Sequence, residues 1–391
     1  VSDMNRSDYL ILGGGTIGCS LAYHLSMRGK KVTVLERRDT ATGTAGASGS
    51  LISWFGSKPG VRLDFTIASH QMLPQLEKDL DSDIGLKLNH GNIQCIANQT
   101  EMSIAEKLVR EHRMDGYEAH IIDLKEAMKI EPAISPELLG AINIPRVHYL
   151  DPIKLAFAFR RNATKRGATF VNDAEVTGLI FERGACVGAH STAGDFYGDA
   201  VINCCGSWAP RIGEMAGIKI PITPRRGQML ITEPVAHFVN AEISSSTFEA
   251  LIYHPELVDD PRILQYNMSF ALEQTESGTA IIHGTREDVG LDTGNEPDVI
   301  ELLLQTACKI VPRLKEMKII RAFSGLRPWS DDMMPFLGAV DSVPGFYLCC
   351  GHGGSGISMS AITGRTMSEL LVDGRAYTFD LTAFSPARIL N

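Results

Sequence analysis

The stretch DYLILGGGTIGCSLA at residues 8–22, followed by KVTVLE at residues 31–36, decides the fold of this chain. An apolar run with the composition of a β-strand leads directly into the pattern G-x-G-x-x-G, and residues 17–27 then have the spacing of a helix. A second apolar strand ends on Glu36. In this strand–turn–helix–strand order the glycine pattern predicts a dinucleotide-binding unit, whereas the same glycines in another context predict little.

Each glycine of the pattern has a physical task. Gly13 permits the tight turn, Gly15 lets the backbone approach a diphosphate, and Gly18 lets the helix pack closely on the strand. The helix N-terminus adds free N–H groups and a partial positive charge, which favour an anion. Glu36 is placed to accept hydrogen bonds from the ribose hydroxyls of an adenosine. We therefore predict that the chain binds an adenine dinucleotide.

Length and composition are those of a globular enzyme. The 391 residues suffice for two lobes with sizeable cores, and 44% of them are hydrophobic. The formal net charge of −9 argues against nucleic acid as a main partner, and no apolar run reaches the length of a membrane span. The polar residues before the first strand lack a signal-peptide core, which argues against secretion. The adjacent cysteines at 204–205 and 349–350 are predicted to be small apolar residues of the core. No C-x-x-C motif and no zinc-ligand spacing occurs. We therefore expect a reducing cytoplasm and no metal site.

A run of small residues, TATGTAGASGS at 40–50, follows the first unit. It is too long for an ordinary turn. Its glycines allow a close approach of backbone to ligand, and its hydroxyls can bond phosphate or ribityl oxygens. The alternative interpretation is a flexible linker, because tracts of this composition often are linkers.

Two further segments have the same strand-to-glycine form as the first: DAVINCCG at 199–206 and GFYLCCG at 345–351. Each is followed by a helical pattern or a turn, and β-rich segments separate the three. This order predicts a nucleotide domain assembled from distant parts of the chain. Residues 221–321 are expected to be mostly strands, with one helix at 297–310.

Together with further motifs, these segments resemble the FAD-dependent amine and amino-acid oxidases of the D-amino acid oxidase superfamily, and most of all glycine oxidase and its sarcosine-oxidase-like relatives. The resemblance runs from residue 8 to about residue 371. The additional motifs are PRRGQ at 224–228, HGTREDVG at 283–290, GLRP at 325–328 and GHGGSG at 351–356. In this order they are specific for the family, though not for a substrate.

The resemblance implies an α/β and α+β fold, in which a Rossmann-type FAD-binding domain is interleaved with a substrate domain built on a large mixed β-sheet. We expect residues 1–85, 145–220 and 322–391 to form the first domain, and residues 86–144 and 221–321 the second. FAD should be bound without a covalent link, because the segment GLRPWSDD has no cysteine of the kind that tethers FAD in some relatives.

The implied FAD site runs from an adenine end at Glu36 to a flavin end between the segments 48–51, 206–208 and 351–357. The amides of the last segment should hold negative charge on the reduced ring. The residues implied to bind FAD are Gly13, Gly15, Thr16, Ile17, Gly18, Glu36, Arg37, Thr44, Ala45, Ala47, Ser48, Ser50, Leu51, Val176, Cys205, Gly206, Trp208, Arg327, Gly351, His352, Gly354, Ser355, Gly356 and Ile357.

The same resemblance implies that Arg327 of G-L-R-P holds the substrate carboxylate. A guanidinium can grip a carboxylate with two parallel charge-assisted hydrogen bonds, which fixes the Cα–H bond over the flavin. Glycine oxidase has a tyrosine as a second partner, but an ungapped count places Ala271 there. Tyr253 or Tyr266 could supply the hydroxyl if the loop differs, although packing in the core is the alternative for both.

His352 follows the last glycine turn. We interpret it as a flavin-contacting or turn-shaping residue, because a substrate that binds with a neutral amine needs no base. Trp54 and His283 are left as possible pocket residues.

The predicted function is oxidation of the C–N bond of a small amino or imino acid, such as glycine, sarcosine, an iminodiacetate-like amine or a D-amino acid. The imine would be hydrolysed, and O2 would reoxidise the flavin to give hydrogen peroxide. The alternative is a dehydrogenase of D-amino acids or 2-hydroxy acids that passes electrons to a quinone or a partner subunit; for a hydroxy acid, His352 would be the base. A flavin subunit that works only within a complex, and a homo-oligomer, are left open.

Overall fold

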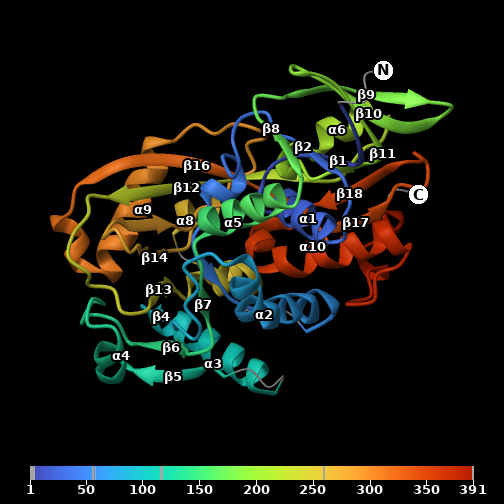
Figure 1. The fold of residues 1–391 in the computed structure, drawn as a ribbon. Coiled ribbons are helices and arrows are strands. Elements are labelled where there is room, and N and C mark those ends of the chain that lie inside the picture. The colour runs from blue at the N-terminus through green and yellow to red at the C-terminus, as the bar shows by residue number, and fades with distance from the viewer. Residues whose placement is uncertain (1–4, 55–56, 58, 115–117, 259, 390–391) are drawn as a thin grey trace.

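The computed structural model describes residues 5–54, 57, 59–114, 118–258 and 260–389 (Figure 1). Within these residues the chain forms two eight-stranded sheets and one two-stranded sheet. The small sheet pairs β3 (Leu51–Ile52) with β7 (His148–Tyr149).

The first sheet contains the strand with which the glycine pattern begins. Its strand order is β17-β18-β11-β1-β2-β8, and β10 adds β9 beside β11. Strands β18, β11, β1, β2 and β8 run parallel, and β17 is antiparallel at the edge. All four residues of β2 are buried, as expected for a parallel sheet covered on both faces. The bounds are β1 (Arg6–Leu12), β2 (Val32–Leu35), β8 (Thr169–Val171), β9 (Val176–Glu182), β10 (Ala185–Ser191), β11 (Gly194–Asn203), β17 (Phe336–Ala339) and β18 (Phe346–Cys350).

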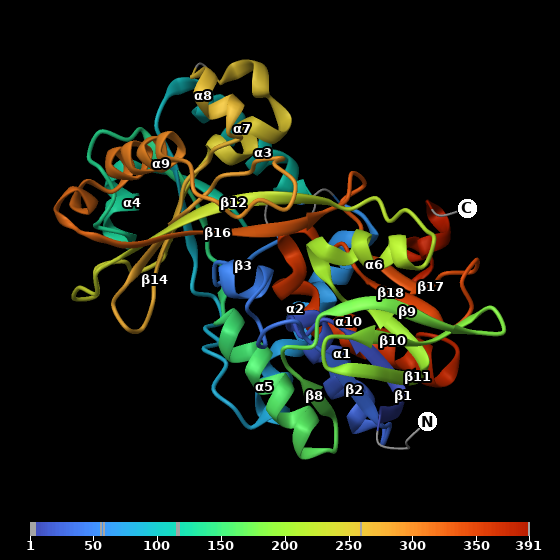
Figure 2. The ribbon, with the colours of Figure 1, turned by 90° about the horizontal axis from the view of Figure 1, so that it is seen from above.

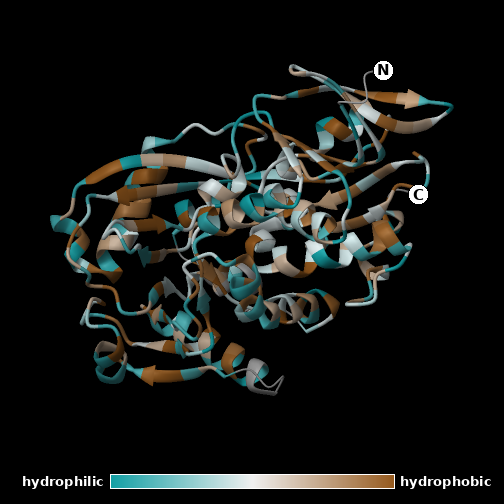
Figure 3. Cartoon of the chain, viewed as in Figure 1, coloured by the Kyte–Doolittle hydropathy of each residue, from teal (hydrophilic) through white to brown (hydrophobic). Residues whose placement is uncertain are grey.

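Helices from distant parts of the chain cover one face of this sheet: α1 (Thr16–Met27), α2 (Val61–Leu80), α5 (Pro152–Lys165) and α10 (Gly356–Asp373). Helix α6 (Ala209–Met215) and the hairpin of β9 and β10 cover the other face. Helix α1 is buried along most of its length, and α2 packs against α10 (Figure 3 shows apolar and polar residues in both). Helices α1 and α10 approach closely, since a side chain at Gly364 would collide with Ser20.

The second sheet is mixed and has the order β16-β12-β15-β14-β13-β4-β6-β5. Only β13 and β4 pair in parallel among its described strands. The long strands β12 and β16 extend from this sheet toward α6 and the first sheet (Figure 2). The bounds are β4 (Asn92–Ile96), β5 (His120–Asp123), β6 (Gly140–Ile144), β12 (Thr223–Thr232), β13 (Glu242–Ser245), β14 (Ala271–Gln274), β15 (Ala280–His283) and β16 (Ile319–Trp329).

Side chains alternate across the second sheet, because successive residues of a strand point to opposite faces. One face is apolar and packs, together with α4 (Leu124–Ile130), against the buried side of α9 (Pro297–Ile310). Its central members are Leu230, Ile282, Leu272, Ile243 and Ile93. The opposite face carries polar residues and turns toward the first sheet, where it bounds the cavity described below.

The expected fold class, a nucleotide-binding α/β unit interleaved with a large mixed sheet, is confirmed, and so is the helix at 297–310. The expectation that 221–321 holds only that helix is wrong. Helices α7 (Thr247–Tyr253) and α8 (Pro261–Gln265) also lie between β13 and β14, next to α3 (Gln99–Met114) (Figure 2). The domain boundaries stay a prediction. In the described part of the chain, no helix has the length and apolar character of a membrane span.

Candidate active site

A single cavity of about 820 Å³ extends from the glycine turn after β1 to the polar face of the second sheet. All residues predicted to bind FAD line it, except Gly18 and Ser50. Of the residues predicted to bind or position substrate, Arg327, His352 and His283 also line it.

The glycine turn forms one end of the cavity. Gly13 has a positive φ of 106°, and a Cβ there would lie 2.7 Å from the carbonyl oxygen of Cys204. Gly18 does not reach the cavity because its backbone packs against the carbonyl of Gly13. At the start of α1, Gly15 has open space before it, and Thr16 Oγ1 is buried with no hydrogen-bond partner among the described residues. No acidic residue occupies the first turn, so this helix end is suited to a diphosphate.

Glu36 is held in place at the same end. One of its carboxylate oxygens accepts a hydrogen bond from the backbone N–H of Gly14 (2.8 Å), and the other from that of Arg38 (3.0 Å). The neighbouring Arg37 guanidinium stacks over the ring of Trp208 at 3.9 Å. These contacts orient a carboxylate and an aromatic surface toward the space that an adenosine would occupy.

The small-residue loop is fixed to the second sheet. Thr44 Oγ1 donates a hydrogen bond to the carbonyl of Leu326 (2.6 Å), and a side chain at Gly325 would collide with Ala47. Ser50 donates to Glu273 from its N–H (2.8 Å) and its hydroxyl (3.1 Å). The flexible-linker interpretation is therefore wrong, and the hydroxyl of Ser50 serves Glu273 instead of a cofactor.

Arg327 lies on β16, where this strand pairs with β12. Its guanidinium extends over Gly227, so that any side chain at that glycine would collide with it. Nη1 donates a hydrogen bond to the carbonyl of Thr285 (3.0 Å), the only hydrogen bond of this guanidinium within the described residues. Burial, with a smaller effect of Arg225, lowers the pKa of Arg327 to about 10, so the group is charged at neutral pH. Its remaining donors are available to an anion in the cavity.

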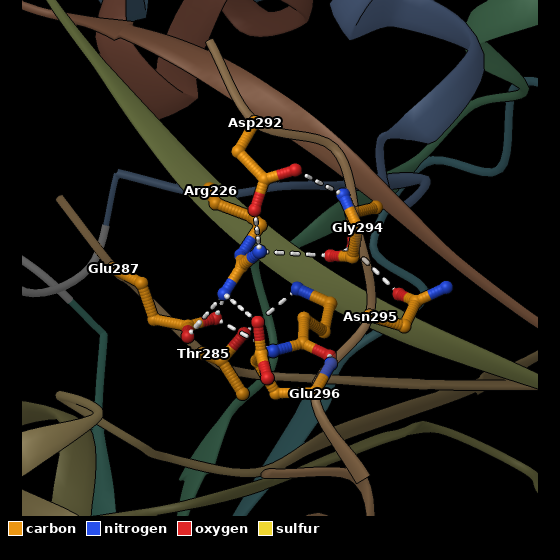
Figure 4. Close-up of polar contacts among 9 residues, drawn as sticks. Arg226, Thr285, Glu287, Asp292, Gly294, Asn295 and Glu296 are labelled. Atoms are coloured by element: carbon orange, nitrogen blue, oxygen red, sulfur yellow. Dashed lines mark hydrogen bonds and ion pairs between the residues drawn. The ribbon is translucent and has the colours of Figure 1, made fainter. Parts of the chain in front are cut away.

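A buried network around Arg226 holds Thr285 in place (Figure 4). Arg226 is only 1% exposed and pairs with both oxygens of Glu287 (2.9 and 3.3 Å) and with Asp292 (2.6 Å). Gln228 joins the network through Glu287 (2.8 Å), and its backbone N–H donates to Thr285 Oγ1 (2.7 Å). The motifs R-G-Q and T-R-E thus form one unit beneath Arg327.

His352 is 3% exposed, and its Nε2 lies 3.2 Å from the hydroxyl of Thr363. Burial, and to a smaller extent Arg62, lowers its pKa to about 3, so the imidazole is neutral at physiological pH. Arg62 itself lines the cavity and donates to Ser355 Oγ (2.8 Å). Sequence reasoning missed Arg62, because nothing in its segment distinguishes it from a surface arginine.

The tyrosine candidates lie elsewhere. Tyr266 packs against the apolar side of the second sheet and does not line the cavity, so we no longer consider it a substrate ligand. Tyr253 ends α7, and its side chain lies outside the described residues. Trp54 makes edge-to-face contacts with the rings of His70 and His148 and does not line the cavity.

The far wall of the cavity contains polar residues that sequence reasoning also missed. Asn92 and Gln94 reach it from β4, and Glu242 and Ser244 from β13. The sequence did contain a signal for this polar face. In NIQC at 92–95 and EISS at 242–245, a polar residue alternates with an apolar one, which places the polar residues on one face of each strand. It does not by itself reveal that this polar face is buried.

A Rossmann-type glycine turn that opens into a cavity under a large mixed sheet is the architecture of a dinucleotide-dependent oxidoreductase. The chain belongs to the FAD-dependent oxidoreductase family: the profile described as "FAD dependent oxidoreductase" (DAO) matches residues 8–370. Its cofactor is FAD, and the unpartnered Thr16 hydroxyl, the open Gly15 and the small-residue loop fit that molecule.

Similar proteins include the hydrogen cyanide synthase subunit HcnC of Pseudomonas aeruginosa, which is 28% identical over 98% of this chain and 97% of that protein. Among solved structures, glycine oxidase from Geobacillus kaustophilus superposes with a TM-score of 0.87 at 23% identity, covering 99% of this chain and 100% of that one. Iminodiacetate oxidase from Chelativorans sp. BNC1 gives a TM-score of 0.81 at 22% identity, with 97% and 98% coverage. These likenesses establish the shared fold.

Proposed function

We propose that this protein oxidises the C–N bond of an amino or imino acid, with non-covalently bound FAD and with O2 as final acceptor. The observation that carries the proposal is Arg327, a charged guanidinium in the wall of the cavity with a single hydrogen bond to the residues that the structure describes. When bound, FAD supplies the acceptor for the electron pair. Names of similar proteins, glycine oxidase and iminodiacetate oxidase, agree with an amino-acid substrate.

The residues of this chain bind and orient the substrate more than they move protons. Arg327 would hold the carboxylate in a fixed orientation, and the Thr285 carbonyl fixes the guanidinium in turn. His352 and His283 are both neutral at pH 7, because burial lowers the pKa of each to about 3. Neither is a strong base, which suits an amine that binds in its neutral form and loses its Cα hydrogen with the electron pair. Water then hydrolyses the imine.

Anaerobic bleaching of the flavin tests the reaction. Glycine, sarcosine, iminodiacetate, D-amino acids and 2-hydroxy acids are added in turn to the FAD-loaded protein. We expect an amine to abolish the oxidised flavin band, and Arg327→Ala to weaken this reaction at least about a hundredfold, since the lost contact is charge-assisted. Bleaching by hydroxy acids alone, or by no amine, would contradict the proposal. Acid precipitation should release FAD into the supernatant if it is not covalently bound.

A second candidate is a dehydrogenase that passes electrons to a partner. The name of HcnC, a subunit of a larger synthase that aligns with this chain over nearly its full length, favours it. Turnover measured in air and with an artificial acceptor under argon separates the two. An oxidase consumes O2 in step with the amine, whereas a dehydrogenase turns over only with the added acceptor.

A further inference from the structure

The polar face of the second sheet provides the cavity with a carboxylate that the reaction described above does not use. On β13, Glu242 and Ser244 point to the cavity, while Ile243 between them enters the apolar core. The antiparallel register pairs Ser244 with Ala271, so Glu242 and Glu273 lie next to each other on the same face. Of these two glutamates, only Glu242 lines the cavity.

Glu242 is 2% exposed, and its Oε2 has no hydrogen-bond partner among the described residues. No lysine, arginine or histidine of the described chain forms an ion pair with it. Burial, and then the nearby Glu273, raises its pKa well above the usual value. Glu273 differs because both of its oxygens accept hydrogen bonds from Ser50.

A buried carboxylate with an unpaired oxygen is costly, by several kcal/mol if it is charged. Among the residues that the structure describes, none forms an ion pair that would compensate this charge. The neighbouring Asn92 and Ser244 bond to each other, since Ser244 Oγ donates to Asn92 Oδ1 (3.1 Å), and give Glu242 no charge compensation. A cationic group that enters the cavity would remove the cost, because a carboxylate and a cation form a strong charge-assisted pair when water is excluded.

We propose that the substrate is a basic amino or imino acid, whose cationic side chain binds Glu242 while its carboxylate binds Arg327. The inference rests on the proposed function and narrows its substrate class. A guanidinium or an ammonium group has the required chemistry. Glu242 is then the residue that determines specificity, on the polar wall of the cavity and apart from the carboxylate site.

The spacing of the two charges agrees with a long substrate. The Arg327 guanidinium lies at the carbonyl of Thr285, which follows β15 by two residues. The registers of β15 with β14 and of β14 with β13 place Glu242 four residues along the sheet and two strands away. At about 3.3 Å per residue and about 4.8 Å per strand, the backbone positions of Thr285 and Glu242 are roughly 16 Å apart. Two side chains and an extended basic amino acid can span this distance, whereas glycine occupies only one end.

The experiment compares cationic ligands with neutral ligands of equal length on the FAD-loaded protein. D- and L-arginine are paired with D- and L-citrulline, and D- and L-lysine with D- and L-2-aminoheptanoic acid. Binding is measured without air from the perturbation of the oxidised flavin spectrum, and flavin reduction is followed separately. We expect each cation to bind at least about tenfold more tightly than its neutral counterpart, the effect of one charge-assisted pair. The lysine and arginine series distinguish ammonium from guanidinium.

Two variants and a control assign the preference to Glu242. Glu242→Gln should bring the ratio of the two dissociation constants, neutral ligand over cationic ligand, close to one. Glu242→Asp should keep a preference for the cation. The control is Glu131→Gln, which changes another buried glutamate whose oxygens accept backbone N–H groups away from the cavity. The control should keep the wild-type ratio.

Citrulline that binds as tightly as arginine, or a ratio that survives in Glu242→Gln, would overturn the proposal. If glycine reduces the flavin and no basic ligand binds preferentially, the proposed function stands and this inference falls. If arginine binds through Glu242 and no amine reduces the flavin, Glu242 is a cation-binding residue, but the proposed function falls and the assignment of the cation as substrate falls with it.

Discussion

At the scale of single residues, the position of Arg327 depends on the missing side chain of Gly227. The guanidinium occupies the space in which a Cβ of residue 227 would lie, and from there it reaches the carbonyl of Thr285. A strand glycine normally weakens a sheet, because it loses more entropy on folding and packs no side chain. Here it allows a side chain from the neighbouring strand to cross the backbone.

We therefore predict that Gly227→Ala displaces Arg327 while the cofactor end of the cavity stays intact. KM for a carboxylate substrate should rise at least about tenfold, since misplaced charge-assisted hydrogen bonds are worth more than 1 kcal/mol. FAD content, read from the visible spectrum, should stay at one per chain. Gly178→Ala on β9 is the control, because its new methyl group would meet only an ordinary contact with His190. An unchanged KM in Gly227→Ala would refute the prediction.

Glu273 gives a second prediction at this scale. Burial raises its pKa from 4.5 to about 7, against the hydrogen bonds from Ser50, which lower it. The folded protein therefore holds a proton that the unfolded chain releases between pH 4.5 and 7. The associated stability is fully present below pH 4.5 and is lost as pH rises through 7, a change of about 3 kcal/mol at most.

Glu273→Gln should remove this contribution. The difference in unfolding free energy between the variant and the wild type should shift in favour of the variant as pH rises from 5 to 8, measured by denaturant titration at each pH. Comparing the two proteins cancels the opposite contribution of buried histidines such as His24 and His70, whose lowered pKa destabilises the fold in acid. A difference that does not change with pH would show that Glu273 titrates normally.

At the scale of elements, the loop between β15 and α9 is fixed to β12 by Arg226. The pair of Arg226 and Glu287 is buried, so removing one partner leaves a charge without compensation. We predict that Arg226→Met lowers the free energy of unfolding by about 3–5 kcal/mol, as for other buried pairs that lose one member. The same variant should raise KM, because Thr285 loses its support.

The matched control is Arg6→Met, which breaks an ion pair with Asp199 in which both side chains are more than half exposed. It should cost no more than about 1 kcal/mol. Denaturant unfolding of both variants gives the comparison. If both variants lower the free energy of unfolding by the same amount, the Arg226 network stabilises the protein no more than a surface ion pair does.

Elements also show how far the sequence could be interpreted. The glycine turn of β1 and α1, the helix α9 and the three strand-to-glycine segments were predictable because their patterns are local. Helices α7 and α8 were not, since they have seven and five residues and are too short for a helical period to be recognised. The buried side chains of Glu242 and Arg62 were missed for another reason: burial of a polar residue becomes visible only when two distant segments are brought together.

At the scale of the whole molecule, the cavity in which we predict FAD to bind is bounded by segments of both large sheets. The cavity is lined by α1 and the glycine turn on one side and by β12, β13 and β16 on the other, and these segments come from both ends and the middle of the chain. A cofactor that contacts all of these segments binds only the native state, because only there do the segments lie side by side. Binding to the native state alone adds RT ln(1 + [FAD]/Kd) to its stability.

We predict that removing FAD lowers the thermal midpoint and that added FAD restores it in a concentration-dependent way. At a free concentration one hundred times Kd the gain is about 2.7 kcal/mol, or roughly 3 °C for a chain of this size. Scanning calorimetry of the apoprotein at several FAD concentrations measures the effect. Thr16→Val removes the hydroxyl at the start of α1 that has no partner among the described residues. It should shift the dependence to higher FAD concentration, while the free energy of unfolding of the apoprotein changes by no more than about 1 kcal/mol. If apoprotein and holoprotein unfold together at every concentration, the two sheets are held by their own packing, and the cofactor occupies a site that is already formed.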